Sequence, residues 1–181
     1  MLKHFFNREG AGMKFFSPPT SPMINASLLV ARLALFTVFI THGSQKMLGW
    51  FGGHGFQATL TGFTQMEHIP VFFALLAIFT EFFAPLALLC GLLTRLAALG
   101  LACIMIVAVA MVHLHNGFFM NWAGHQKGEG IEFFILSGAL ALALIISGAG
   151  DWSFDNLIYQ RWRTARSAPI HSEVHAATQS R

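Results

Sequence analysis

The sequence predicts an all-α polytopic membrane protein in which four transmembrane helices form an antiparallel bundle, with a short interfacial helix in the first outer loop. Composition and pattern both support this fold class. Hydrophobic residues make up 55% of the 181 residues, and charged residues only 10%. The apolar residues gather in four long runs that contain few charges. A nucleic-acid-binding module or a disordered chain could not keep so much apolar surface in water, so both classes are excluded and no nucleic-acid partner is expected.

The first apolar run predicts a helix over residues 24–42, although Arg32 interrupts it. A central arginine costs about 3 kcal/mol on an insertion scale, whereas each Leu, Ile, Val or Phe returns about 0.3 to 0.6 kcal/mol, so this helix inserts with help from its neighbours. A cleaved signal peptide is the alternative. Arg32 would split its apolar region, and residues 43–45 make a poor cleavage site, so the spanning helix is favoured.

Three further runs predict spanning helices over residues 70–91, 95–115 and 131–149. A helix rises 1.5 Å per residue and needs about 20 apolar residues to cross about 30 Å of hydrocarbon, which is close to the length of each run. Gly91 suits the left-handed position at a helix C-terminus, and Thr94 is suited to cap the helix that follows. The second and third helices are therefore expected to be antiparallel neighbours.

The first outer loop is glycine-rich over residues 49–56 and then becomes amphipathic. Four apolar residues at helical spacing form one stripe, opposite polar residues: Phe56, Leu60, Phe63 and Met66. This pattern predicts a short helix that lies on the outer membrane interface.

Lysines and arginines are concentrated before the first helix, between the second and third, and after the fourth, whereas the outer loops carry only Lys46 and Lys127. By the positive-inside rule both termini are cytoplasmic. The chain then divides into a cytoplasmic N-terminal tail at 1–23, a membrane domain at 24–150, and a cytoplasmic interfacial segment with a flexible tail at 151–181.

Two charges lie deep in the predicted bundle. Arg32 is about 15 Å inward from the expected outer end of the first helix, and Glu81 is about 16 Å inward from the outer start of the second. Opposite charges at one depth would relieve each other's cost in hydrocarbon, so an ion pair between Arg32 and Glu81 is predicted. Pro85 lacks the N–H that would bond the carbonyl of Glu81, which leaves an acceptor for water or a polar ligand beside the carboxylate.

Further polar residues are expected at the outer helix ends, where antiparallel packing would gather them. The predicted site is an outward-facing cavity for ligand binding or proton relay, with Arg32 and Glu81 at its floor and His42, Lys46, His113 and Glu132 at its entrance. Two plainer interpretations remain open. The ion pair could serve only to hold the bundle together, and the others could be charges that the helix dipole or the interface favours.

Metal and thiol chemistry are not predicted. No HExxH pattern and no carboxylate-plus-two-histidine spacing occurs, and there is no CxxC pair. Cys90 and Cys103 both lie inside apolar runs and are interpreted as small packing residues.

Several motifs together resemble the DoxX family of small four-helix membrane proteins. They are RLALFTVFITHGSQKMLGWFGGHGF, GLLTR, HLHNGFF and a closing GxGxxSxD pattern, within a likeness that runs from about Leu28 to Ile158. The family's polar positions fall here on Arg32, His42, Gly43, Lys46, Glu81, Arg95, His113 and Glu132. The stretch GDWSFD departs from the family's more usual turn, which leaves the exit of the fourth helix less certain.

The resemblance implies a bacterial inner-membrane location and an association with quinone-linked redox chemistry, without an established substrate. The leading hypothesis is a redox-associated subunit that binds a small organic or quinone-like molecule, with a quinone as the candidate cofactor and a redox protein or a second copy of the chain as candidate partners. The chain carries no haem, flavin or iron–sulfur signature, so electrons would have to come from the ligand or a partner. A proton-linked carrier of a small solute and a non-catalytic assembly subunit are the alternatives.

Overall fold

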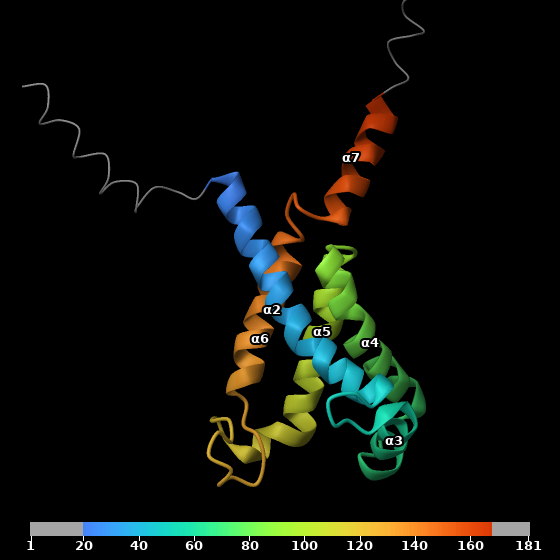
Figure 1. The fold of residues 1–181 in the computed structure, drawn as a ribbon, viewed down its shortest axis with the longest axis vertical. Helices are drawn as coiled ribbons and strands as arrows, with labels where there is room; N and C mark the ends of the chain where they lie inside the picture. Colours follow the sequence, from blue (N-terminus) through green and yellow to red (C-terminus); the bar gives the residue numbers. More distant parts are fainter. Residues whose placement is uncertain (1–19, 168–181) are drawn as a thin grey trace, which may run out of the picture.

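The computed structural model describes residues 20–167, and this part of the chain is helical without strands (Figure 1). Three helices are long and apolar enough to cross a membrane: α2 (Ser21–Leu48), α4 (Val71–Cys90) and the segment 94–116. That last segment is α5 (Thr94–Ala108), continued by a π-helical turn, η3 (Val109–His113), and a 3₁₀ turn, η4 (Leu114–Asn116). A fourth apolar helix, α6 (Glu132–Ser147), is shorter, with 16 residues. Residues 1–19 and 168–181, where parts of both predicted tails fall, lie outside the described residues.

The first helix is longer than the sequence suggested. It has 28 residues and ends at Leu48, six residues past the expected end at His42. The next residue, Gly49, takes the left-handed conformation with φ 74°. Gly43 remains helical, packed against α4, so the helix continues until Gly49 provides the left-handed cap. The predicted depth of Arg32 was counted from His42 and therefore started from the wrong residue.

Helices α2 and α4 cross closely at Gly43. A Cβ atom at this position would collide with the backbone of Glu81 and Phe82. The carbonyl of Glu81, which Pro85 leaves without its usual helical donor, thus faces the Cα of Gly43. The sequence suggested water or a ligand at this carbonyl, but close helix packing occupies the place.

The buried core runs along the middle of the bundle, where α2, α4, α5 and α6 meet. Its large, fully buried aliphatic side chains are Leu35, Ile78, Leu88, Leu101 and Leu144. Ser137 and Ala141 pack inside this core, and the Ser137 hydroxyl donates to the carbonyl of Phe133. Large apolar residues on the outer faces, such as Phe72, Phe83, Leu96 and Ile106, are exposed, as expected for helices surrounded by lipid.

Cys90 and Cys103 are also free and exposed on these outer faces. The sequence predicted small apolar packing residues, and the structure shows that neither cysteine belongs to the buried core. An apolar sequence context does not separate a lipid-facing position from a core position, because both faces of such a helix are apolar.

The first loop forms α3 (Gly55–Thr61), which runs into a π-helical turn, η2 (Gly62–Met66). Phe56 packs on Phe79 of α4, with ring centroids 6.1 Å apart. The wide π turn breaks the helical repeat, so Met66 leaves the predicted stripe and is 79% exposed. The two segments fold against α2 and α4 at one end of the bundle, together with the second loop, and we call residues 42–70 and 113–132 the loop end (Figure 1).

The opposite end, residues 20–32, 88–97 and 148–167, is called the arginine end. Here Gly91 closes α4 in the left-handed conformation, with φ 65°, as predicted. A last helix, α7 (Phe154–Ser167), stands clear of the bundle on the side where α2 begins (Figure 1). Its apolar side chains Phe154, Leu157 and Trp162 are about half exposed.

Candidate functional site

An ion pair between two side chains joins α2 to α4. Lys46 Nζ lies 2.6 Å from Glu81 Oε1. The side chain of Glu81 is 8% exposed and that of Lys46 is 27% exposed. Glu81 is thus enclosed halfway along α4, while Lys46 extends to it from the last turns of α2 and remains open on one side.

Two more polar side chains adjoin this pair. His42, one turn before Lys46, is exposed yet close enough to interact electrostatically with both Lys46 and Glu81. Gln45 donates from Nε2 to the carbonyl of Phe51, 3.1 Å away, and so ties α2 to the first loop. The loop fits tightly there, because a Cβ at Gly53 would collide with the backbone of Gln45. His42, Lys46 and Glu81 form what we call the outer cluster.

The predicted pairing of Arg32 with Glu81 is wrong. Arg32 lies beside Gly91, where a Cβ atom would occupy the position of Arg32 Nη1. Gly91 is ten residues from Glu81, about 15 Å along α4 at 1.5 Å per residue. The longer α2 places Gly43 opposite Glu81, and Lys46, one turn further, reaches the carboxylate instead. Arg32 therefore cannot form the floor of a cavity that opens at the loop end.

Arg32 instead binds the chain that leaves α6. It is 1% exposed, and its Nη2 donates to the carbonyl of Trp152 at 2.7 Å. Next to it, the side chain of Asn25 and Asp151 exchange two hydrogen bonds: Asn25 Nδ2 donates to Asp151 Oδ2 at 2.8 Å, and the N–H of Asp151 donates to Asn25 Oδ1 at 2.9 Å. Both contacts fasten the start of α2 to the turn before α7.

Asp155 holds the helical hairpin at the same end. Its two carboxylate oxygens accept from the backbone N–H groups of Leu93 at 2.7 Å and Thr94 at 2.9 Å, and its own N–H donates to the carbonyl of Gly91. The carboxylate therefore caps the N-terminus of α5 from another helix. The expectation that Thr94 caps this helix is wrong, since its hydroxyl is buried without a partner. Asp155 was missed, although the closing GxGxxSxD pattern contained it.

His113 and Glu132 form hydrogen bonds with the second loop rather than with the outer cluster. His113 Nδ1 lies 2.9 Å from the carbonyl oxygen of Glu129, and its ring packs on Phe134 with centroids 4.4 Å apart. Glu132 Oε1 accepts from the N–H of Met120 at 3.0 Å and from Trp122 Nε1 at 3.1 Å. Within residues 20–167, the contacts of His113 and Glu132 join them to this loop and not to the Lys46–Glu81 pair.

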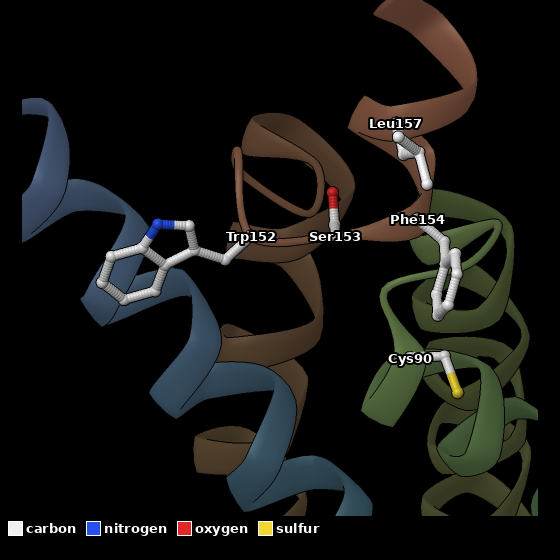
Figure 2. Close-up of a pocket in the computed structure, with 5 residues that line it drawn as sticks. All are labelled: Cys90, Trp152, Ser153, Phe154 and Leu157. Carbon is white, nitrogen blue, oxygen red and sulfur yellow. The ribbon is translucent and has the colours of Figure 1, made fainter. Parts of the chain in front are cut away.

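A hollow of about 260 Å³ lies at the arginine end. Cys90, Trp152, Ser153, Phe154 and Leu157 line it, and Figure 2 shows Phe154 and Leu157 of α7 over Cys90, with the Trp152 indole turned away from them. Among the described residues, no group of three or more His, Cys, Asp or Glu side chains could hold a metal ion.

The chain was compared with protein families, with individual proteins and with solved structures. The model of the DoxX family matches residues 27–114. The inner membrane protein YqjF of Escherichia coli (strain K12) is 30% identical over 138 residues, which is 76% of this chain and 96% of that protein. No solved structure matches the chain.

Proposed function

Because this chain belongs to the DoxX family, we propose that it is a redox-associated membrane subunit that binds a small organic, quinone-like molecule at the outer cluster. It is an integral, multi-pass inner-membrane protein, as its apolar helices and its similarity to an inner membrane protein of E. coli indicate. The ligand and the redox association are the proposal.

The observation that carries the proposal is the Lys46–Glu81 ion pair, enclosed by apolar helices. Two charges taken out of water are costly, and a well-packed apolar pair of similar volume is often as stable. Ionisable side chains at membrane depth therefore mark ligand or proton pathways more often than they add stability.

The outer cluster has the donors that such a ligand requires. A quinone is a mainly apolar ring with two carbonyl oxygens, which accept hydrogen bonds but carry no charge. The ammonium of Lys46, 27% exposed, and the exposed ring of His42 offer N–H groups, while Glu81 beneath them can exchange a proton. Electrons would come from the ligand or from a partner protein, since the chain has no redox cofactor signature of its own.

We also propose that α6 crosses the membrane, which gives the bundle four spans. Its 16 residues cover about 24 Å, and Ile131 with Gly148 and Ala149 extend the apolar length to about that of a thin bilayer. Lysine and arginine placement then puts both termini in the cytoplasm and α3 at the outer interface. Labelling of single cysteines at positions 10, 125 and 175 in intact cells tests this arrangement; only position 125 should react with a membrane-impermeant reagent.

Ligand binding is tested on the purified chain in nanodiscs, by titration with a short-chain quinone analogue. We expect Lys46→Met and Glu81→Gln to weaken binding about tenfold or more, since each removes a charged hydrogen-bonding partner. His42→Ala should weaken binding while it spares the fold. Lys127→Met, in the second loop, is the matched control and should bind as the unaltered chain does. A thermal melt of each variant separates lost binding from lost structure.

Three outcomes decide between the functions. Binding that depends on the outer cluster supports the proposal. Uptake of a solute into vesicles in response to a pH gradient, without quinone binding, would show a proton-linked carrier instead. The absence of both would leave a non-catalytic assembly subunit and would overturn the proposal.

A further inference from the structure

Arg32 is a buried cation whose hydrogen-bonding groups are mostly unused. Its side chain is 1% exposed, and of its three nitrogens only Nη2 has an acceptor, the carbonyl of Trp152. Nε and Nη1 are buried without a partner. Asp155 is near enough to interact electrostatically, but its two oxygens already accept from Leu93 and Thr94. A buried charged donor without an acceptor is unfavourable, and it is usually explained by a water or an ion.

One of the unused nitrogens, Arg32 Nη1, lies near the wall of the hollow at the arginine end. A Cβ atom at Gly91 would collide with Arg32 Nη1 on one side and come within 2.6 Å of Ser153 Cβ on the other. Ser153 and Cys90, the residue before Gly91, line the hollow. Arg32 Nη1 is thus close to Ser153, but it does not itself line the hollow and is almost completely enclosed.

The outer rim of the same hollow is apolar and cationic. Phe154 and Leu157 of α7 line it, and Arg161 follows them on the same helix face, at spacings of seven and four residues. The N–H groups of Asp155, Asn156 and Leu157 at the start of α7 are already bonded to Gly91 and Ser153. The helix terminus therefore adds no free donors here, and the arginines remain the groups that would bind an anion.

We propose that this hollow binds a phosphate group, which Arg161 bonds at the rim and which the enclosed positive charge of Arg32 attracts from behind the wall. Arg161 can bond phosphate oxygens through its N–H donors, whereas the enclosed Arg32, which forms no ion pair within the described residues, contributes its positive charge. Basic pockets between membrane helices bind phospholipid headgroups in this way. The apolar lining by Phe154 and Leu157 suits the glycerol and first methylenes of a phospholipid, whereas a free phosphate would need only the arginines. The site lies at the opposite end from the outer cluster and does not depend on the proposed function.

The full-length chain, purified in detergent with added phosphatidylglycerol, tests the site by native mass spectrometry. We expect Arg32→Gln to lower the bound fraction about tenfold or more, because the positive charge behind the hollow is lost. Leu157→Glu leaves Arg32 in place but puts a carboxylate at the hollow, and it should have the same effect. Tyr159→Glu adds the same charge on the opposite face of α7, about 200° around the helix from Leu157, and should retain the lipid. The Leu157→Glu variant keeps the test valid if Arg32→Gln fails to fold.

A parallel thermal melt compares phosphatidylglycerol, phosphatidylcholine and inorganic phosphate. Stabilisation by phosphatidylglycerol that exceeds stabilisation by inorganic phosphate, and that is lost in Leu157→Glu but not in Tyr159→Glu, supports a phospholipid at the site. Equal stabilisation by inorganic phosphate supports the same phosphate site with a free anion. Lipid retention that Leu157→Glu leaves unchanged, or that Tyr159→Glu lowers equally, would overturn the proposal.

Discussion

The loop end and the arginine end differ in the partners that they provide for a buried cation. At the loop end, Lys46 meets the carboxylate of Glu81 at 2.6 Å, so the charge is neutralised by a side chain of a neighbouring helix. At the arginine end, Arg32 bonds one carbonyl of the loop after α6 and leaves two nitrogens unused. Yet Arg32 is the more deeply buried of the two cations.

This difference shows how each end of the bundle is held together. Carboxylates at both ends accept backbone N–H groups: Glu132 in the second loop and Asp155 at the α4–α5 turn. At the arginine end the nearest carboxylate is thus occupied with a helix terminus. Arg32 must therefore bond backbone carbonyls or a bound molecule. At the loop end, Glu81 is free to pair with Lys46.

The largest expected effect comes from breaking the pair at the loop end. Glu81→Ala should lower the free energy of unfolding by up to about 3–5 kcal/mol, less if the partly exposed Lys46 turns toward the interface. Chemical denaturation in mixed micelles measures the change. The double variant with Lys46→Ala should cost less than the sum of the single changes.

By contrast, Arg32→Ala with Glu81→Ala should be additive within about 0.5 kcal/mol, because the two side chains share no partner. Strong coupling between Arg32 and Glu81 would contradict the arrangement described here.

The next effect tests the crossing that brings Lys46 to Glu81. Gly43→Ala should cost about 1–3 kcal/mol, because its Cβ collides with the backbone of Glu81 and the helices must separate. Gly138→Ala, in the middle of α6 with open space around the added atom, is the control and should be neutral or stabilising. Thermal-melt midpoints compare the two, and equal shifts would argue against close packing at Gly43.

A smaller effect is expected from the cap at the arginine end. Asp155→Ala removes two acceptors from the N-terminus of α5 and should cost about 1–2 kcal/mol. Hydrogen exchange of the Leu93 and Thr94 amides measures the loss at the cap itself. If those amides stayed as protected as before, Asp155 would not be the capping group.

The smallest effect is expected at Thr94. Its hydroxyl is buried without a partner, while its backbone N–H bonds Asp155 whatever the side chain. Thr94→Val keeps the shape and should change the free energy of unfolding by less than about 0.5 kcal/mol, or stabilise the chain. A loss comparable to that of Asp155→Ala would show that the hydroxyl caps the helix after all.

Much of the helical pattern could be predicted from the sequence. The apolar runs beginning near residues 70, 95 and 131 become helices starting at Val71, Thr94 and Glu132, and Gly91 takes the left-handed conformation. The candidate site was predicted only in part. Lys46 and Glu81 were both named, but Glu81 was given the wrong partner, since the end of α2 was placed six residues too early.

The sequence by itself determined that this is an all-helical membrane protein, because apolar runs of this length have no stable place in water and lipid leaves their backbone no option but the helix. Which polar groups meet was decided by tertiary structure alone. A close approach at one glycine fixes the height at which two helices cross, and a helix turns by 100° at each residue, so a difference of a few residues replaces one partner with another. For the same reason Arg32, Trp152 and Asp155 come together only when the chain after α6 folds back over the ends of α2 and α4.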